Sequence, residues 1–271
     1  METLRVETAQ PGTYEDALER VDVLGVPVAC LDVTAMLDLV RRWSFEPTRR
    51  TILYVNAHCL NTAYHDPEYH AILNRADLVY SDGISVVWSA RWLDGRRLHK
   101  MTGADWIYDF ADWAQAANRH QPDGVRVYIL AGKPGIAHAA SHNLRRKFPG
   151  IHIVGACDGF FQEKSQAAVL QDIAETKPHV LFVGMGTPLQ EKWLAAHRDE
   201  IAAPVCWAVG ALFDYVAGVE PRVPAWMNAL ALEWLFRMLI DPAGKWRRYI
   251  LGNPLFILRI LRQKLGFQLS R

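Results

Sequence analysis

The sequence lacks several features that would place it in a familiar class at once. Its 271 residues contain no C-x-x-C pair, so neither a zinc site nor a disulfide framework is indicated. Lysine and arginine total 30 against 29 acidic residues, a balance that argues against nucleic-acid binding. No uninterrupted apolar stretch reaches the ~18–20 residues that span a bilayer. The four cysteines are far apart in apolar stretches and are expected to be free thiols: Cys30, Cys59, Cys157 and Cys206.

Common nucleotide-binding and metal-binding motifs are also missing. The segment VGMGTPLQEKW fails as a dinucleotide fingerprint because position 189 is leucine. Gly132-Lys133 is followed by Pro134, so it is not a Walker A motif. No glycine loop is followed by an acidic residue placed to bind the ribose of a dinucleotide, which disfavours a dehydrogenase. No D-x-D occurs either, so the usual carboxylate clamp for a catalytic metal is absent, and we expect neither a metal nor a cofactor.

The sequence does contain a regular alternation of short β-branched apolar runs and longer amphipathic segments. This pattern predicts an α/β fold with a Rossmann-like, mostly parallel sheet flanked by helices. We expect a loosely held arm over residues 1–20, an α/β domain over 21–218 and a helical, basic C-terminal appendage over 219–271. The predicted strands are Val26–Leu31, Thr51–Asn56, Leu78–Tyr80, Val125–Leu130, His152–Ala156, Val180–Val183 and Val205–Val209. The predicted helices are Thr34–Trp43, Pro67–Arg75, Ser85–Trp92, Ala104–Arg119, Ile136–Lys147, Gln162–Thr176, Leu189–Ile201, Ala225–Leu239 and Pro254–Leu265.

Polar residues and glycines gather where the predicted strands end. Ligands of open α/β sheets bind beyond the carboxyl ends of the strands, so these clusters predict a crevice there. In the segment after the sixth strand, glycines allow close approach of backbone amides, and the following helix start favours an anion. We expect Gln190 and Glu191 to point from that helix toward the crevice; the alternative is an ordinary strand–turn–helix junction. The strand-end candidates for substrate binding are Gly83, Gly132, Gly184, Gly186 and Asp214.

Several stretches together carry a resemblance to a known family. They are VNAHCLN, DPEYHAILNRADLVYSDGISVVWSARWLDG, MTGADWIYDF, LAGKPG, VGMGTPLQEKW, AVGALFDYVAGVEPRVPAWMNALALEWLFRMLIDP and KWRRYILGNP. In this order and spacing they resemble the WecG/TagA/CpsF glycosyltransferases over about residues 22–256. The resemblance implies an inverting enzyme that uses a UDP-sugar such as UDP-N-acetylmannosamine. It also implies a polyprenyl-diphosphate-linked sugar as acceptor, in synthesis of envelope polysaccharide or exopolysaccharide.

The residues can be matched to that chemistry. Inverting transfer needs a base for the acceptor hydroxyl and cations or dipoles for the departing UDP. Asp82 is the candidate base, although an Asp-Gly turn is common, and Asn56 is its candidate partner. The family places the stretch containing Thr102 and Gly103 at the site, although these residues also fit a helix cap with Asp105. Relatives more often carry Arg at the position of Lys100, and some carry Thr at the position of Tyr54. The identity of the donor sugar therefore stays open.

Arginines of the appendage are the candidates for the diphosphate, in a metal-independent mechanism. Glu233 and Arg237 are spaced i,i+4, so a surface ion pair is the alternative reading for that arginine. The family pattern usually has a further arginine at the position of Gly244, and Lys245 is its imperfect substitute. The candidate arginines are Arg222, Arg237, Arg247 and Arg248.

The end of the appendage predicts contact with a membrane. Residues 243–271 contain seven basic residues and no acid. In the last predicted helix, Arg259, Arg262 and Gln263 form a narrow polar strip on an otherwise apolar surface. We expect a cytoplasmic protein, peripheral on the inner face of the cytoplasmic membrane. The alternative is that this last helix packs on the protein's own sheet or on a second protomer of a homo-oligomer. Trp226 and Trp234 are candidates for contact with lipid or acceptor, and a nucleotide-sugar-binding module without catalysis is the alternative function.

Overall fold

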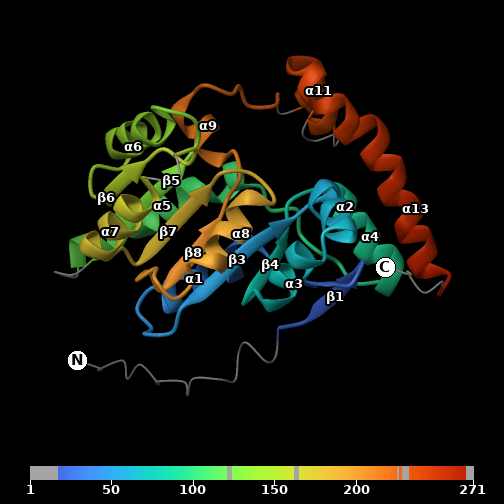
Figure 1. Ribbon diagram of the computed structural model, residues 1–271, viewed down its shortest axis with the longest axis horizontal. Helices are drawn as coiled ribbons and strands as arrows, with labels where there is room; N and C mark the ends of the chain where they lie inside the picture. Colours follow the sequence, from blue (N-terminus) through green and yellow to red (C-terminus); the bar gives the residue numbers. More distant parts are fainter. Residues whose placement is uncertain (1–17, 121–123, 162–164, 225, 228–231, 267–271) are drawn as a thin grey trace, which may run out of the picture.

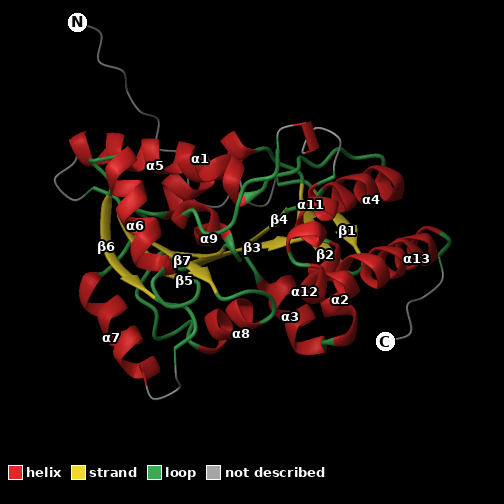
Figure 2. Ribbon diagram, turned by 90° about the horizontal axis from the view of Figure 1, so that it is seen from above, coloured by secondary structure: helices red, strands yellow, loops and turns green. Residues whose placement is uncertain are grey.

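In a computed structural model of the chain, a six-stranded sheet lies between two layers of helices (Figures 1 and 2). The structure describes residues 18–120, 124–161, 165–224, 226–227 and 232–266. The strand order is β4-β3-β8-β7-β5-β6, and every neighbouring pair is parallel. The predicted α/β fold is therefore confirmed. The strands are β3 (Arg50–Val55), β4 (Leu78–Ser81), β5 (Arg126–Ala131), β6 (His152–Cys157), β7 (Val180–Gly184) and β8 (Val205–Ala208).

Successive residues of the strands face opposite sides, so the sheet separates two apolar cores. In β3, Ile52 belongs to one core and Leu53 to the other. The first core is covered by α1 (Val33–Trp43), α5 (Gly103–His120), α6 (Ile136–Lys147) and α9 (Leu212–Ala217). The second is covered by α2 (Ala57–His65), α3 (Pro67–Arg75), α4 (Ile84–Asp94), α7 (Gln166–Thr176) and α8 (Leu189–Ala196).

The first predicted strand does not belong to this sheet. Val26–Ala29 (β2) instead pairs antiparallel with β1 (Arg20–Val23) in a separate hairpin. Leu24 and Gly25 form its turn with φ values of 56° and 79°, as a tight hairpin turn requires. Leucine seldom adopts positive φ, so a two-residue turn at Leu24 was not predicted. Residues 1–17 of the predicted arm lie outside the described part of the chain.

Several described helices were not predicted, and others end at different residues. The prediction lacked α2, α9 and the two short helical segments Pro242–Trp246 and Arg247–Leu251, while α8 ends at Ala196 rather than Ile201. Gln162 lies outside the described residues, as do residue 225 and residues 228–231 of the predicted Ala225–Leu239 helix. The described helices of the appendage are α11 (Glu233–Ile240), α12 (Pro242–Trp246), a π-helical turn η2 (Arg247–Leu251) and α13 (Gly252–Lys264).

The appendage returns along the outside of the molecule to the N-terminal half of the chain. In Figure 1 it runs as the orange and red segment from α11 down to α13, beside α2 and α4. Phe256 and Ile260 of α13 are buried in the second core. The Gln263 side chain accepts from Leu24 N at 2.9 Å and donates to Asp22 Oδ1 at 2.8 Å. The appendage is thus packed on both the core helices and the hairpin.

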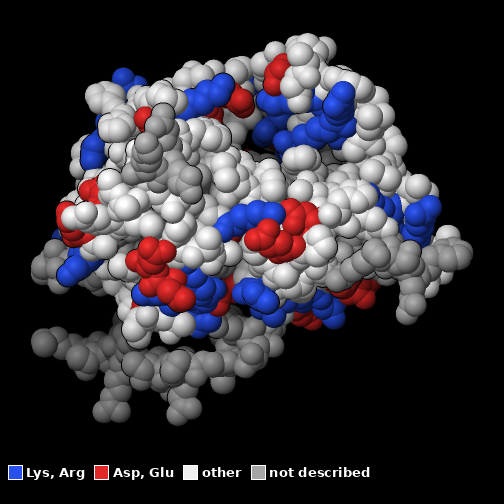
Figure 3. Space-filling view, in the orientation of Figure 1, with Lys and Arg blue, Asp and Glu red and all other residues white. Residues whose placement is uncertain are grey.

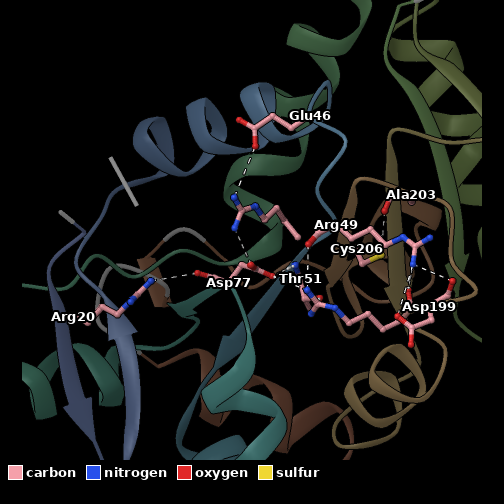
Figure 4. Close-up of polar contacts among 10 residues, drawn as sticks. Arg20, Glu46, Arg49, Thr51, Asp77, Asp199, Ala203 and Cys206 are labelled. Atoms are coloured by element: carbon pink, nitrogen blue, oxygen red, sulfur yellow. Dashed lines mark hydrogen bonds and ion pairs between the residues drawn. The ribbon is translucent and has the colours of Figure 1, made fainter. Parts of the chain in front are cut away.

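The amino end of the sheet is closed by a polar network around Asp77 (Figure 4). One carboxylate oxygen of Asp77 accepts from Thr51 N at 2.8 Å, and the other pairs with Arg50 at 3.2 Å. These contacts tie the start of β3 to the residue before β4. This carboxylate therefore stabilises the sheet at the end opposite to the loops that follow the strands.

Candidate functional site

A cavity of about 460 Å³ lies at the carboxyl edge of the sheet. Its floor is formed by the ends of β3, β4 and β8, and its outer wall by residues of the appendage. Figure 3 shows a hollow on the upper part of the molecule with Lys and Arg side chains on its borders. Its polar lining residues are Tyr54, Asn56, His58, Tyr80, Asp82, Thr102, Asp105, Thr187, Tyr215, Arg222, Glu233, Arg237 and Arg248.

Asn56 and Asp82 meet at the floor of this cavity. Asn56 is the N-cap of α2, and its Oδ1 accepts from the backbone N–H groups of His58 and Cys59 at 3.0 and 3.1 Å. Its amide nitrogen is thereby directed at Asp82 and donates to Oδ2 at 3.3 Å. Gly83 follows with φ of 154°, in the region that favours glycine. The helix cap and the glycine together fix the carboxylate at the strand end.

The surroundings of Asp82 keep its proton affinity high. Burial raises the pKa of this carboxyl to about 7, with Arg237 acting in the opposite direction and Glu233 adding to the increase. The hydrogen bond from Asn56 lowers the same pKa. A carboxylate with a pKa near 7 is ionised often enough at neutral pH to act as a base, and it holds a transferred proton well.

Arg237 and Glu233 lie in the wall above Asp82 rather than on the protein surface. Arg237 donates to Glu233 Oε1 from two of its nitrogens, at 3.0 and 2.6 Å, and each side chain is only 24% exposed. Lys100 of the core pairs with the other Glu233 oxygen at 3.2 Å. Burial alone would raise the pKa of Glu233, but these two cations bring it below its ordinary value. The predicted ion pair therefore exists, but it joins the appendage to the core at the site.

Two more of the predicted arginines line the cavity. Arg222 donates to the carbonyl oxygen of Ala104 at 2.6 Å and lies over the ring of Tyr108. Arg248, in η2, lines the same cavity on the side of the appendage. Three arginines from separate segments thus converge on one space.

The fourth predicted arginine is placed differently. Arg247 is exposed, with its guanidinium 5.4 Å from the ring centre of Trp246, and it is not among the cavity-lining residues. Lys245, the expected substitute for an arginine at Gly244, pairs with Glu220 at 3.7 Å.

The strand-end glycines divide into two groups. Gly103 and Gly186 line the cavity, and a side chain at Gly103 would meet Leu212 at 2.9 Å. Thr102 also lines it, but its hydroxyl and its backbone N–H both donate to Asp105, at 2.6 and 3.1 Å, as a helix cap. Gly132, Gly184 and Asp214 lie at strand ends or on α9 without lining the cavity.

Gln190 and Glu191 do not point into the crevice, as the sequence had led us to expect. Both are fully buried, because the first turn of α8 faces the protein interior. Gln190 Oε1 accepts from the backbone N–H of Gly210 at 3.0 Å, and its amide donates to Glu191 at 2.8 Å. Thr187, which lines the cavity, also donates to Glu191 at 2.9 Å. This pair therefore joins the loops that follow β7 and β8, both of which line the cavity.

His58, Thr187 and Tyr215 line the cavity but were not predicted. Burial and the nearby Arg248 lower the pKa of His58 to about 4, so its imidazole is neutral at pH 7. His58 lies in the first turn of α2, a helix whose weak apolar periodicity hid it in the sequence. Asn56 two residues earlier was the available signal, because asparagine is a preferred N-cap residue.

Within the described ranges, no three His, Cys, Asp or Glu side chains come together as a metal site. Nor is any helix of these ranges long and apolar enough to cross a membrane. The positive charge in the cavity wall comes from Arg222, Arg237 and Arg248.

Comparison with known proteins identifies the family. The family model described as "Glycosyl transferase WecG/TagA/CpsF family" matches residues 21–269. An N-acetylglucosaminyldiphosphoundecaprenol N-acetyl-beta-D-mannosaminyltransferase of Bacillus subtilis (strain 168) is 27% identical over 240 residues, covering 88% of this chain and 90% of the relative. A protein of the same name from Bacillus spizizenii is 30% identical, covering 74% and 75%. Another from Staphylococcus aureus (strain NCTC 8325 / PS 47) is 28% identical over 252 residues, covering 90% and 93%. The chain therefore belongs to the WecG/TagA/CpsF family of glycosyl transferases.

Proposed function

We propose that this glycosyltransferase moves a hexose or N-acetylhexosamine, such as N-acetylmannosamine, from a UDP-sugar to a polyprenyl-diphosphate-linked sugar. The names of the relatives support a lipid-linked acceptor and N-acetylmannosamine as the sugar. Such a reaction would serve cell-envelope polysaccharide or exopolysaccharide synthesis. The observation that carries the proposal is Asp82, a carboxylate with a pKa raised to about 7 in a cavity with arginines.

The proposed reaction is a single displacement with inversion. Asp82 takes the proton of the acceptor hydroxyl as its oxygen attacks the anomeric carbon of the donor. The bond from that carbon to the UDP oxygen breaks, and UDP leaves with the electron pair. Asn56 orients the carboxylate through its 3.3 Å hydrogen bond. The proton then passes from Asp82 to water when the products leave.

In this proposal arginines supply the positive charge that the departing diphosphate requires. Arg222, Arg237 and Arg248 all line the cavity, and guanidinium groups bind phosphate oxygens in bidentate geometry. Glu233 accepts two hydrogen bonds from Arg237, and the guanidinium group still lines the cavity. The absence of D-x-D from the sequence is consistent with this arrangement.

We further propose that the enzyme acts as a peripheral protein on the inner face of the cytoplasmic membrane. Arg259 and Gln263 of the polar strip face the protein, contrary to our expectation that the strip would meet lipid, whereas Arg262 is exposed. Arg259 is 3% exposed and donates to Asn61 Oδ1 at 2.6 Å. The exposed face of α13 is mainly apolar, with Arg262 and Lys264 beside the apolar residues, and a bilayer interface would cover it. Its exposed apolar residues are Leu255, Ile257, Leu258, Leu261 and Leu265.

The alternative function, a nucleotide-sugar-binding module without transfer, needs no carboxylate at position 82. The deciding experiment incubates the purified full chain with a panel of UDP-sugars, and measures UDP release with and without a lipid-diphosphate sugar. We expect release that depends on the acceptor and on one preferred donor. Tight donor binding without acceptor-dependent release would support the binding module and contradict transfer.

A further inference from the structure

A second, smaller cavity of about 130 Å³ adjoins the first one. The two cavities share one group of wall residues, so they meet at the proposed base. The shared residues are Asn56, His58, Asp82, Glu233, Arg237 and Arg248. The small cavity is further lined by Ser85, Lys100, Trp234, Tyr249 and Asn253.

We propose that this small cavity is the acceptor subsite and holds the sugar ring whose hydroxyl is glycosylated. The large cavity then holds the nucleotide-sugar, and Asp82 lies at the boundary between the two substrates. This assignment rests on the transfer reaction proposed above and adds to it the place of each substrate.

The sizes of the two cavities support this division. The large cavity, of about 460 Å³, lies within the range of roughly 300–1,000 Å³ that is usual for small-molecule sites. The small cavity, of about 130 Å³, falls below that range and has room for about one sugar ring, not for a nucleotide-sugar. Only the large cavity can therefore hold the donor.

The positions of the cavities point the same way. The large cavity lies over the carboxyl ends of the strands, where open α/β sheets bind nucleotides. The small cavity lies between the start of α4 and three elements of the appendage: Trp234 comes from α11, Tyr249 from η2 and Asn253 from α13. α13 also carries the exposed apolar face, so an acceptor anchored in lipid would approach from that side.

The chemistry of the small cavity suits a sugar. Trp234 and Tyr249 lie with ring centres 6.3 Å apart, and such rings offer an apolar face together with a polar edge. Ser85, Asn253 and Lys100 supply hydrogen-bonding groups around them. A hydroxyl of a ring held there would be adjacent to Asp82, which belongs to both walls. The base is thus reached from the acceptor side and from the donor side.

The experiment measures initial rates while donor and acceptor are varied separately. The acceptor is N-acetylglucosaminyl diphosphate on a short, water-soluble lipid chain, so membrane binding does not enter. We expect Trp234→Ala and Ser85→Leu each to raise the KM for the acceptor about tenfold or more. The KM for the donor and the calorimetric affinity for UDP should stay within twofold. Trp88→Ala is the matched control, because Trp88 is 62% exposed on α4 and lines neither cavity.

Arg222→Ala provides the reverse test, since Arg222 lines only the large cavity. It should raise the donor KM and leave the acceptor KM unchanged. Ser85 belongs to the core and Trp234 to the appendage. If circular dichroism shows that one of these variants is misfolded, the other still tests the proposal. If Trp234→Ala and Ser85→Leu turn over but change both KM values equally, or leave the acceptor KM unchanged, the assignment of the acceptor subsite is wrong while the proposed function stands. No turnover by the wild type with any donor and acceptor pair would overturn the proposed function, and the subsite with it.

Discussion

The pKa of Asp82 is set by its burial and by the charged and hydrogen-bonding groups around it. Burial raises its pKa to about 7, whereas Arg237 and Asn56 lower it. Asp82 and Asn56 could be chosen in advance because parallel strands end at the same edge of a sheet. Their direct contact at 3.3 Å depends on the start of α2, which was not predicted.

The first prediction concerns the carboxylate itself. Asp82→Asn should lower turnover by about 10²–10⁴, the usual contribution of general base catalysis, because an amide cannot take the acceptor proton. Donor affinity measured by calorimetry should stay within a few fold. Asp112→Asn, an exposed aspartate on α5, is the control and should leave both quantities unchanged. Turnover of Asp82→Asn within threefold of the wild type would exclude this residue as the base.

The second prediction concerns pH. Because the base works in its ionised form, kcat/KM should fall on the acid side of a pKa of about 7 for Asp82. Arg237 lowers this pKa, so Arg237→Gln should move the acid limb to higher pH. Glu233 raises it, so Glu233→Gln should move the limb to lower pH. Two shifts in the same direction, or an acid limb near pH 4 in the wild type, would contradict the account of Asp82.

The third prediction separates two adjacent arginines. Arg248 lines both cavities, whereas Arg247 is exposed and lines neither. Arg248→Ala should therefore lower kcat/KM about tenfold or more, and Arg247→Ala should lower it by less than threefold. Both variants and the wild type should keep their activity in excess chelator. If chelation stops turnover and magnesium or manganese restores it, the arginine-based mechanism is wrong.

At the level of helices and strands, periodicity predicted the sheet, but it did not predict which side chains of the appendage face the protein. The strands of the sheet were recognisable because each is a short apolar run between turn residues. Arg247 and Arg248 are adjacent in η2, a π-helical turn, and only Arg248 lines the cavity. The sequence predicted no helix over these residues, so it could not show which of the two side chains faces the cavity.

From the sequence we expected Arg259, Arg262 and Gln263 to form one strip directed at lipid, which is wrong for the buried Arg259 and for Gln263. A helical wheel shows which residues share a face, not which face is buried. Arg259 lies 3.9 Å from the ring centre of Tyr64 and donates to Asn61 and to His65 on α2. Arg259 thus joins α13 to the core, whereas Arg262 and the apolar surface of this helix are exposed.

The fourth prediction tests this attachment. Arg259→Leu should lower the free energy of unfolding by about 1.5–3 kcal/mol, because hydrogen bonds from a charged donor to α2 are lost. Arg262→Leu is the matched control on the exposed side of α13 and should change stability by less than about 0.5 kcal/mol. Urea unfolding of the two variants measures the difference. Equal effects would show that Arg259 does not hold the helix.

For the molecule as a whole, the site is completed by segments far apart in the sequence. Core strands supply Asp82 and Asn56, while the appendage supplies Arg237 and Arg248. Sequence reasoning found residues from both parts because each belongs to a recognisable motif. It could not find the boundary between the two cavities, since that depends on the fold bringing Trp234 and Tyr249 to the same cavity as the start of α4.

The last prediction concerns the exposed face of α13 and what covers it. Truncating the chain before α13 would also remove Phe256 and Ile260 from the core, so substitutions on the outer face are the cleaner test. The triple variant Ile257→Gln, Leu258→Gln, Leu261→Gln should fold like the wild type and lose flotation with anionic vesicles, because burial of apolar surface in the interface is removed. Arg262→Gln should weaken binding to anionic vesicles by about 1 kcal/mol, and only at low salt, since its effect is electrostatic.

The outcomes of flotation and size-exclusion chromatography distinguish the two possible partners of this face. Flotation of the wild type but not of the triple variant assigns the face to the membrane. Equal flotation of both proteins would mean that another surface binds lipid. If neither floats, and the wild type elutes as a dimer where the triple variant elutes as a monomer, a second copy of the chain covers α13. In that case the acceptor would have to reach the small cavity past a partner subunit, and its KM would depend on enzyme concentration.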